Sequence, residues 1–139
     1  FFMQNKVVII TGASSGIGKA LAEQYASEGW NLGLAARRID RLQALEEKLN
    51  KGEVLSVKTD ITLESDCQNL IKKAVEKFGR IDILINNAGI IKRIPIEEMS
   101  VQEFSDVINI DLVAPFIMGK AGKNELLGVP CISLNTGNI

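Results

Sequence analysis

The sequence contains no histidine and only one tyrosine, one tryptophan and two cysteines among its 139 residues. Without histidine, every catalytic triad that uses an imidazole is excluded, and so are the usual zinc sites. The two cysteines, Cys67 and Cys131, have neither a metal-ligand spacing nor the pattern of a disulfide framework. We therefore expect buried, reduced thiols and a cytoplasmic location.

An excess of charge of either sign is also missing. Sixteen basic and seventeen acidic residues give a net charge of −1, which offers no general attraction to nucleic acid or to an anionic membrane. No apolar run approaches the length of a membrane span, and no signal peptide is visible. The composition, with 46% hydrophobic and 24% charged residues, predicts one globular domain over residues 1–139, without a nucleic-acid partner and without a membrane span.

Apolar runs alternate along the chain with segments of helical periodicity. Strands are predicted at 6–11, 31–37, 54–60, 82–85 and 130–134. Helices are predicted at 17–29, 40–49, 62–79 and from a capping box of Ser100 and Glu103 onward. The strands are apolar throughout, which is typical of a parallel sheet covered on both faces. The fold class is therefore α/β, a Rossmann-type doubly wound parallel sheet in three layers, incomplete in its second half.

Several helices carry more specific signals. Ile17, Leu21 and Tyr25 recur every four residues, so we expect this face of the first helix to pack on the sheet or at its border. Thr62 is expected to cap the third helix, and Pro115 to kink the fourth helix or lie near its end.

The segment TGASSGIG at 11–18 lies between the first strand and the first helix. A helix start presents free N–H groups and the positive end of the helix dipole, so a phosphate is stabilised there if no side chain blocks it. Gly12, Gly16 and Gly18 permit a tight turn and a close approach, and Ser14 and Ser15 supply hydroxyl donors. A glycine-rich turn without a ligand is the alternative, but the position within βα units favours a phosphate-binding loop.

The second strand is expected to end beside the ribose of an adenosine. An NAD site needs an acid there, whereas this chain has Ala36, Arg37 and Arg38. Two guanidinium groups without a carboxylate suit a 2′-phosphate, and the sequence therefore predicts NADP(H). The alternative is a solvated basic loop.

Three motifs in this order, TGASSGIG, Asp60 after the third strand and NNAG at 86–89, resemble the classical short-chain dehydrogenases/reductases. The resemblance covers residues 6 to about 112. It implies a single-domain NAD(P)-dependent oxidoreductase, assembled as a homodimer or homotetramer. Such an enzyme transfers a hydride between the nicotinamide and a small-molecule carbonyl or alcohol substrate.

The resemblance also implies roles for individual residues. The pyrophosphate would be held by Gly12, Ser14, Ser15, Gly16, Ile17 and Gly18. Arg37, helped by Arg38, would bind the 2′-phosphate. The carboxylate of Asp60 would accept from the adenine amine, with Ile61 beside it. The ribose would be lined by Asn87, Ala88 and Gly89. The alternative for Asp60 and for NNAG is an ordinary turn without a ligand.

The catalytic residues of the family are not matched. Its general acid/base is a tyrosine with a lysine four residues later, and the only tyrosine here, Tyr25, lies in the first helix. Asp111 stands where the family has an asparagine. We expect Asp111 to be either an anionic site residue or a locally bonded structural acid.

The last residues permit two interpretations. GKAGKNELLG resembles the region after the family's catalytic tyrosine, so that Lys120 would be the active-site lysine and Thr136, Gly137 and Ile139 would approach the nicotinamide. This preferred interpretation implies that a segment with the tyrosine is missing near 118–120. In the other interpretation, 130–134 is the fifth strand itself and nothing is missing. For Lys120, the alternative is a solvated lysine at a helix end.

Two functions remain open. The first is an NADP(H)-dependent oxidoreductase with a carbonyl or alcohol substrate. The second is a catalytically inactive nucleotide-binding module that acts as a regulator or a partner subunit.

Overall fold

The computed structural model describes residues 6–90, 92–125 and 131–133. Strands and helices alternate through most of this part. In chain order the elements are β1 (Val7–Thr11), α1 (Gly16–Ser27), β2 (Asn31–Ala36), α2 (Ile39–Glu46), β3 (Val54–Lys58), α3 (Glu64–Phe78), β4 (Ile83–Asn86), α4 (Val101–Ile108), the π-helical η1 (Asn109–Val113), α5 (Ala114–Glu125) and β5 (Cys131–Ser133).

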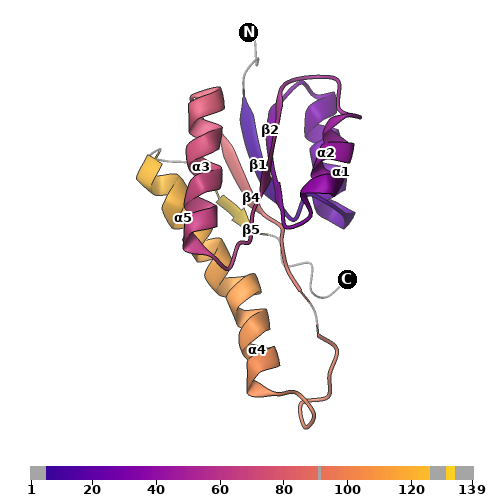
Figure 1. The fold of residues 1–139 in the computed structure, drawn as a ribbon, viewed down its shortest axis with the longest axis vertical. Coiled ribbons are helices and arrows are strands. Elements are labelled where there is room, and N and C mark those ends of the chain that lie inside the picture. The colour runs from indigo at the N-terminus through magenta and orange to yellow at the C-terminus, as the bar shows by residue number, and fades with distance from the viewer. Residues whose placement is uncertain (1–5, 91, 126–130, 134–139) are drawn as a thin grey trace.

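The strands form one parallel sheet in the order β3-β2-β1-β4-β5. Helices α1 and α2 lie on one face of the sheet, and α3 and α5 lie on the other (Figure 1). The chain thus builds outward from β1 in both directions, which is the doubly wound, three-layered fold that the sequence predicts. In such a sheet the crevice at the carboxyl ends of β1 and β4 is the usual place for a ligand.

The core consists of two clusters, one on each face of the sheet. Alternate residues of β1 point to opposite faces, so Ile9 belongs to the α3–α5 side while Val8 and Ile10 belong to the α1–α2 side. All five residues of β1 are buried, which explains why the strand is apolar up to Thr11, whose hydroxyl is hydrogen-bonded. Cys67 of α3 is buried as a free thiol, and burial raises its pKa to about 11. The side chain of Cys131 lies outside the described part.

Helix α1 packs on the sheet largely as the periodicity predicts, since Leu21 and Tyr25 are partly buried against the core cluster of the α1–α2 side. The centre of the buried face is made by Gly18, Ala22 and Ala26, however, and Ile17 is 40% exposed. Small side chains allow the helix axis to approach the sheet closely, and Tyr25 lies half-buried at its border.

The predicted signals are confirmed at the start of α4 and at the end of α3, but not at the start of α3. The capping box of α4 is confirmed, since the Glu103 N–H donates to Ser100 Oγ at 3.2 Å and the Ser100 N–H donates to Glu103 Oε2 at 2.9 Å. Gly79 ends α3 with a φ of 75°, as predicted. The prediction that Thr62 caps α3 was wrong, because the cap position is Leu63.

The long helix that begins at Val101 does not end at Pro115. It widens into the π-helical turn η1, where the Ala114 N–H donates to the Asn109 carbonyl five residues earlier, and then continues as α5. A proline has no N–H to donate, and its ring clashes with the carbonyl four residues earlier in a regular α-helix. A widened turn directly before Pro115 accommodates both effects.

Helix α4 projects away from the sheet (Figure 1). None of its residues is buried. Large apolar side chains along α4, η1 and α5 are exposed, namely Val101, Phe104, Leu112, Val113 and Phe116. No helix in the described ranges is both long and apolar enough to cross a membrane.

Candidate nucleotide-binding site

A pocket of about 460 Å³ lies at the carboxyl ends of the strands. This volume falls within the range of about 300–1,000 Å³ that is common for small-molecule sites. The pocket is lined by Gly12, Ser14, Ser15, Gly16, Ile17, Ala35, Ala36, Arg37, Arg38, Arg41, Thr59, Asp60, Ile61, Thr62, Asn87, Ala88, Gly89, Ile90 and Ile110. The loops after four parallel strands therefore contribute to one cavity.

The glycine loop has the geometry of a phosphate cradle. Gly12 and Gly16 have φ values of 65° and 56°, a conformation that favours glycine. A Cβ atom on Gly16 would meet nothing within 4 Å, so the backbone there faces open space. Ser15 is the N-cap of α1 without a side-chain capping bond, which leaves the first N–H groups of the helix to a ligand.

The loop is fastened to the turn after β4 by two polar side chains. Thr11 Oγ1 accepts hydrogen bonds from the N–H groups of Asn87 and Ala88, both at 3.1 Å. Asn87 Nδ2 donates to the carbonyls of Thr11 and Gly12, both at 3.2 Å. These bonds fix the glycine loop relative to β4.

Gly18 takes part in the same arrangement although it does not line the pocket. A Cβ on Gly18 would lie 2.3 Å from the Gly12 carbonyl oxygen and 2.4 Å from Asn87 Nδ2. Among the described residues, Asn87 Oδ1 is the one buried side-chain N or O atom without a hydrogen-bond partner. Buried polar atoms without a partner are rare in native proteins, and a ligand bound beside this cradle would account for this one.

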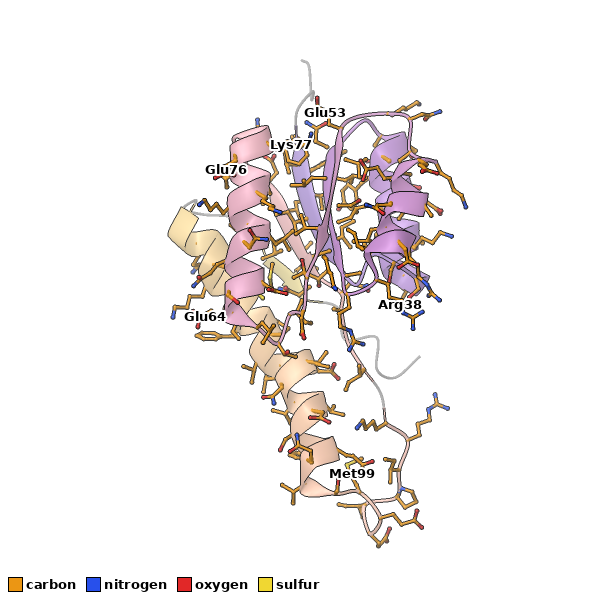
Figure 2. The ribbon with its side chains drawn as sticks, viewed as in Figure 1. Arg38, Glu53, Glu64, Glu76, Lys77 and Met99 are labelled. Carbon is orange, nitrogen blue, oxygen red and sulfur yellow. The ribbon has the colours of Figure 1, made fainter. Side chains whose placement is uncertain are left out.

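The edge of the pocket beyond β2 is basic. Arg37 and Arg38 follow β2 directly, and Arg41 lies in the first turn of α2. Arg38 lies at the lower end of the α1–α2 layer in Figure 2, at the same end of the sheet as the glycine loop. Asp60 is the one acidic residue in the lining.

Asp60 follows β3 and is held by its own loop. Its Oδ1 accepts from Thr62 Oγ1 at 2.6 Å and from the Thr62 N–H at 3.0 Å. The hydrogen bond from the Thr62 side chain, followed by the backbone hydrogen bond and the charge of Arg37, outweighs burial and lowers the pKa of Asp60. The residue is therefore an anion and an acceptor at neutral pH.

Asp111 lies in η1 and binds the loop after β4. Its Oδ1 accepts from the Ile90 N–H at 3.0 Å, and a Cβ on Gly89 would lie 3.1 Å from the same oxygen. Asp111 does not line the pocket, whereas its neighbour Ile110 does. Of the two expectations for Asp111, the geometry favours the locally bonded acid, and a catalytic role stays a prediction.

Lys120 is not among the residues that line the pocket. It lies in α5, and its Nζ is 4.0 Å from Oε1 of Glu64 at the start of α3, the end marked by the Glu64 label in Figure 2. More than half of each of the two side chains is exposed. This placement agrees with the alternative of a solvated lysine, and the expected role as an active-site lysine stays a prediction.

The order of the sheet also bears on the end of the chain. Strand β5 pairs directly with β4, with Ile85 opposite Ile132, so residues 131–133 form the fifth strand of the sheet. This pairing agrees with the interpretation in which residues 130–134 are the fifth strand itself. The preferred interpretation, with a segment missing near 118–120, stays a prediction. Thr136, Gly137 and Ile139 lie outside the described residues.

The structure thus brings together most of the predicted cofactor residues. Within the described part, all of them except Gly18 line the pocket. Sequence reasoning missed Thr11, Arg41 and Thr62. Arg41 lies in the first turn of the helix that begins directly after Arg37 and Arg38, and this closeness in the sequence is the one signal that could have indicated it.

Glycines at a strand–helix junction, uncapped helix N–H groups and an acceptor after β3 define a Rossmann-type nucleotide-binding fold. The residues fit the adenosine-diphosphate half of a nicotinamide dinucleotide. In the described ranges, no group of three or more metal-ligating side chains could hold a metal ion.

Comparison with known proteins gives the family. The family model for short chain dehydrogenases matches residues 6–138, so the chain belongs to the short-chain dehydrogenase/reductase family of oxidoreductases. An uncharacterized oxidoreductase of Listeria monocytogenes is 42% identical over 112 residues, which are 79% of this chain and 45% of the relative. The chain therefore spans less than half the length of this relative.

Solved structures agree with this assignment. An alcohol dehydrogenase from the archaeon Thermococcus sibiricus, complexed with 5-hydroxy-NADP, superposes with a TM-score of 0.87 at 34% identity, over 92% of this chain and 57% of that chain. A 3-ketoacyl-(acyl-carrier-protein) reductase from Brucella melitensis, complexed with NADH, gives a TM-score of 0.79 at 30% identity, over 84% of this chain and 48% of that chain. Nicotinamide cofactors with and without a 2′-phosphate thus both occur among similar structures.

Proposed function

We propose that the chain is the nucleotide-binding part of an NADP(H)-dependent oxidoreductase that acts on a small carbonyl or alcohol substrate. The observation that carries this proposal is the basic edge of the pocket. The residues after β2 are Arg37 and Arg38, where a cofactor without a 2′-phosphate would need a carboxylate. The acidic residue of the pocket, Asp60, follows β3 instead and is bonded to Thr62.

Each part of the pocket would have a separate task. The uncapped N–H groups of α1 and the open backbone at Gly16 would bind the pyrophosphate. Arg37 and Arg38 would bind the 2′-phosphate, and Asp60 would accept a hydrogen bond from the adenine amine. When bound, the nicotinamide supplies or accepts the hydride. The bonds of Thr11 and Asn87 would hold the loops in place around it.

The substitution Arg37→Glu tests the cofactor choice. It would place a carboxylate beside the 2′-phosphate, so NADPH should bind much more weakly while NADH binding changes little. We expect the ratio of the two dissociation constants to shift by at least about tenfold, as for the loss of one charge-assisted contact. Fluorescence titration with both cofactors measures the ratio. An equal loss of affinity for both would contradict the 2′-phosphate assignment.

A second candidate is a nucleotide-binding module without catalysis, acting as a regulator or partner subunit. It is favoured by the position of the only tyrosine, Tyr25, whose ring packs edge-on against Trp30 with centroids 5.0 Å apart. Tyr25 lies on α1 and does not line the pocket. The mass of the polypeptide isolated from its source separates the candidates. A mass near 15.2 kDa with NADPH binding but no turnover would support the module, and a larger mass with carbonyl reduction would support the enzyme.

We further propose that the protein forms a homodimer or homotetramer. The proposal is supported by the apolar side chains that α4 and α5 expose, among which Phe104 is 58% and Phe116 is 68% accessible. Exposed apolar patches of this kind commonly mark association surfaces. Sedimentation velocity gives the mass of the assembly, and a monomer at all concentrations would contradict this proposal.

A further inference from the structure

Arg41 is a charged residue of the pocket that has no task in the function proposed above. It is the third residue of α2, one turn beyond Arg38, and its side chain is exposed at the rim of the cavity. Long side chains on a helix lean toward its N-terminus, which here is the end next to the pocket. Leu42 and Leu45 anchor α2 in the core, so the position of Arg41 relative to the sheet is fixed.

In the part of the chain that the structure describes, the guanidinium of Arg41 is not paired with a carboxylate and can therefore bind an anionic ligand. None of the ion pairs among the described residues includes Arg37, Arg38 or Arg41. Arg37 does act on Asp60, whose pKa its charge helps to lower. The lining of the pocket therefore holds three guanidinium groups and a single carboxylate, which is itself bonded to Thr62.

A phosphate monoester carries about −1.5 to −2 charges at neutral pH and offers three acceptor oxygens. Arg37 also interacts electrostatically with Asp60. Arg37 and Arg38 alone therefore do not fully balance the negative charge of a phosphate monoester. A third guanidinium on the same rim completes the compensation, and the fork of an arginine suits a phosphate.

We propose that Arg41 is a specificity-determining residue that binds the 2′-phosphate together with Arg37 and Arg38. The inference rests on the proposed function, because it presupposes that the 2′-phosphate lies beside the loop after β2. It goes further in assigning part of the preference for NADP(H) to helix α2.

Three adenosine nucleotides test this without catalysis. Calorimetric titration of the chain with adenosine 2′,5′-bisphosphate, adenosine 3′,5′-bisphosphate and 5′-AMP gives the affinity gained from a phosphate at each position. For the unmodified chain we expect the 2′,5′-bisphosphate to bind more tightly than both of the others. Equal binding of all three would contradict the proposed function itself, and the inference with it.

The variants then test Arg41 alone. In Arg41→Gln, the preference for the 2′,5′-bisphosphate over 5′-AMP should fall about five- to tenfold, the effect of one exposed charge-assisted contact. The affinity for 5′-AMP should be unchanged, which also shows that the variant is folded. Arg41→Lys should recover part of the preference, since it restores the charge but not the fork.

Lys48→Gln is the matched control. It changes the net charge by the same amount at an exposed site beyond the far end of α2, outside the pocket. The preference should be unchanged in this control. The inference is wrong if Arg41→Gln keeps the preference of the unmodified chain, if the control loses as much, or if the variant loses 5′-AMP equally.

Discussion

Replacement of Gly18 by alanine tests the packing of the phosphate loop. The added Cβ would lie 2.3 Å from the carbonyl oxygen of Gly12 and 2.4 Å from Asn87 Nδ2. Neither atom can move freely, because Nδ2 is bonded to the carbonyls of Thr11 and Gly12. The substitution must therefore displace the loop from the turn after β4.

The expected magnitude follows from opposing contributions. Alanine favours a helix over glycine by about 1 kcal/mol, so a mutation without a steric conflict would stabilise the protein. Overpacking costs about 1–3 kcal/mol. Loss of the two hydrogen bonds from Asn87 Nδ2 costs about 1 kcal/mol each. The free energy of unfolding should therefore fall by about 2–4 kcal/mol, and nucleotide binding should weaken because the loop moves.

Gly16→Ala is the internal comparison, two residues away. Its Cβ would meet nothing within 4 Å, and only the φ of 56° opposes the change. That strain costs about 1–2 kcal/mol. Urea unfolding followed by circular dichroism measures both variants. If Gly18→Ala unfolds with the same free energy as the unmodified chain or a higher one, the close contact among Gly18, Gly12 and Asn87 is wrong.

Two further substitutions test single polar contacts. Asp111→Asn retains an oxygen that can accept from the Ile90 N–H and should leave the free energy of unfolding nearly unchanged, whereas Asp111→Ala should lower it by about 1–3 kcal/mol; equal effects in urea unfolding would contradict this contact. For Asp82, burial alone would raise the pKa, but hydrogen bonds from Arg80 and from the Val7 N–H hold it below its usual value. The anion of Asp82 therefore stabilises the fold above about pH 4, and this stability is lost as the pH falls through the lowered pKa. Asp82→Asn should lower the melting temperature at pH 7 and have little effect at pH 2; an equal effect at both values would refute the reasoning.

The strands and the glycine loop could be predicted from the sequence because their signals are local. A parallel strand that is buried on both faces is apolar along nearly its whole length, as β1 is over residues 7–10. A positive φ at Gly12 and Gly16 likewise needs glycine at fixed places. Such signals do not depend on which other elements are nearby.

The centre of the buried face of α1 and the cap of α3 could not be predicted, because they depend on partners distant in space or on competing bonds. Close packing on the sheet selects the small residues Gly18, Ala22 and Ala26 over the larger Ile17. The hydroxyl of Thr62 can cap a helix or bind Asp60, and the structure shows the bond to Asp60. Short-range propensity does not distinguish these outcomes.

The positions of Lys120 and Arg41 show the same limit at the site. The motif around Lys120 matches by residue type, but the lysine lies near Glu64 and does not line the pocket, and its catalytic role stays a prediction. Arg41 has no motif of its own and joins the pocket only because α2 begins directly after the basic loop. Residue identity indicated the chemistry, but the order of the sheet decides which side chains meet.

The central claim is that the basic edge after β2 makes the pocket selective for a dinucleotide that carries a 2′-phosphate. The most direct measurement is the pair of dissociation constants of the unmodified chain for NADPH and NADH, at one pH and one ionic strength. Tighter binding of NADPH by at least about tenfold, decreasing as salt is added, is the predicted result. Equal affinities, or a preference for NADH, would contradict the account.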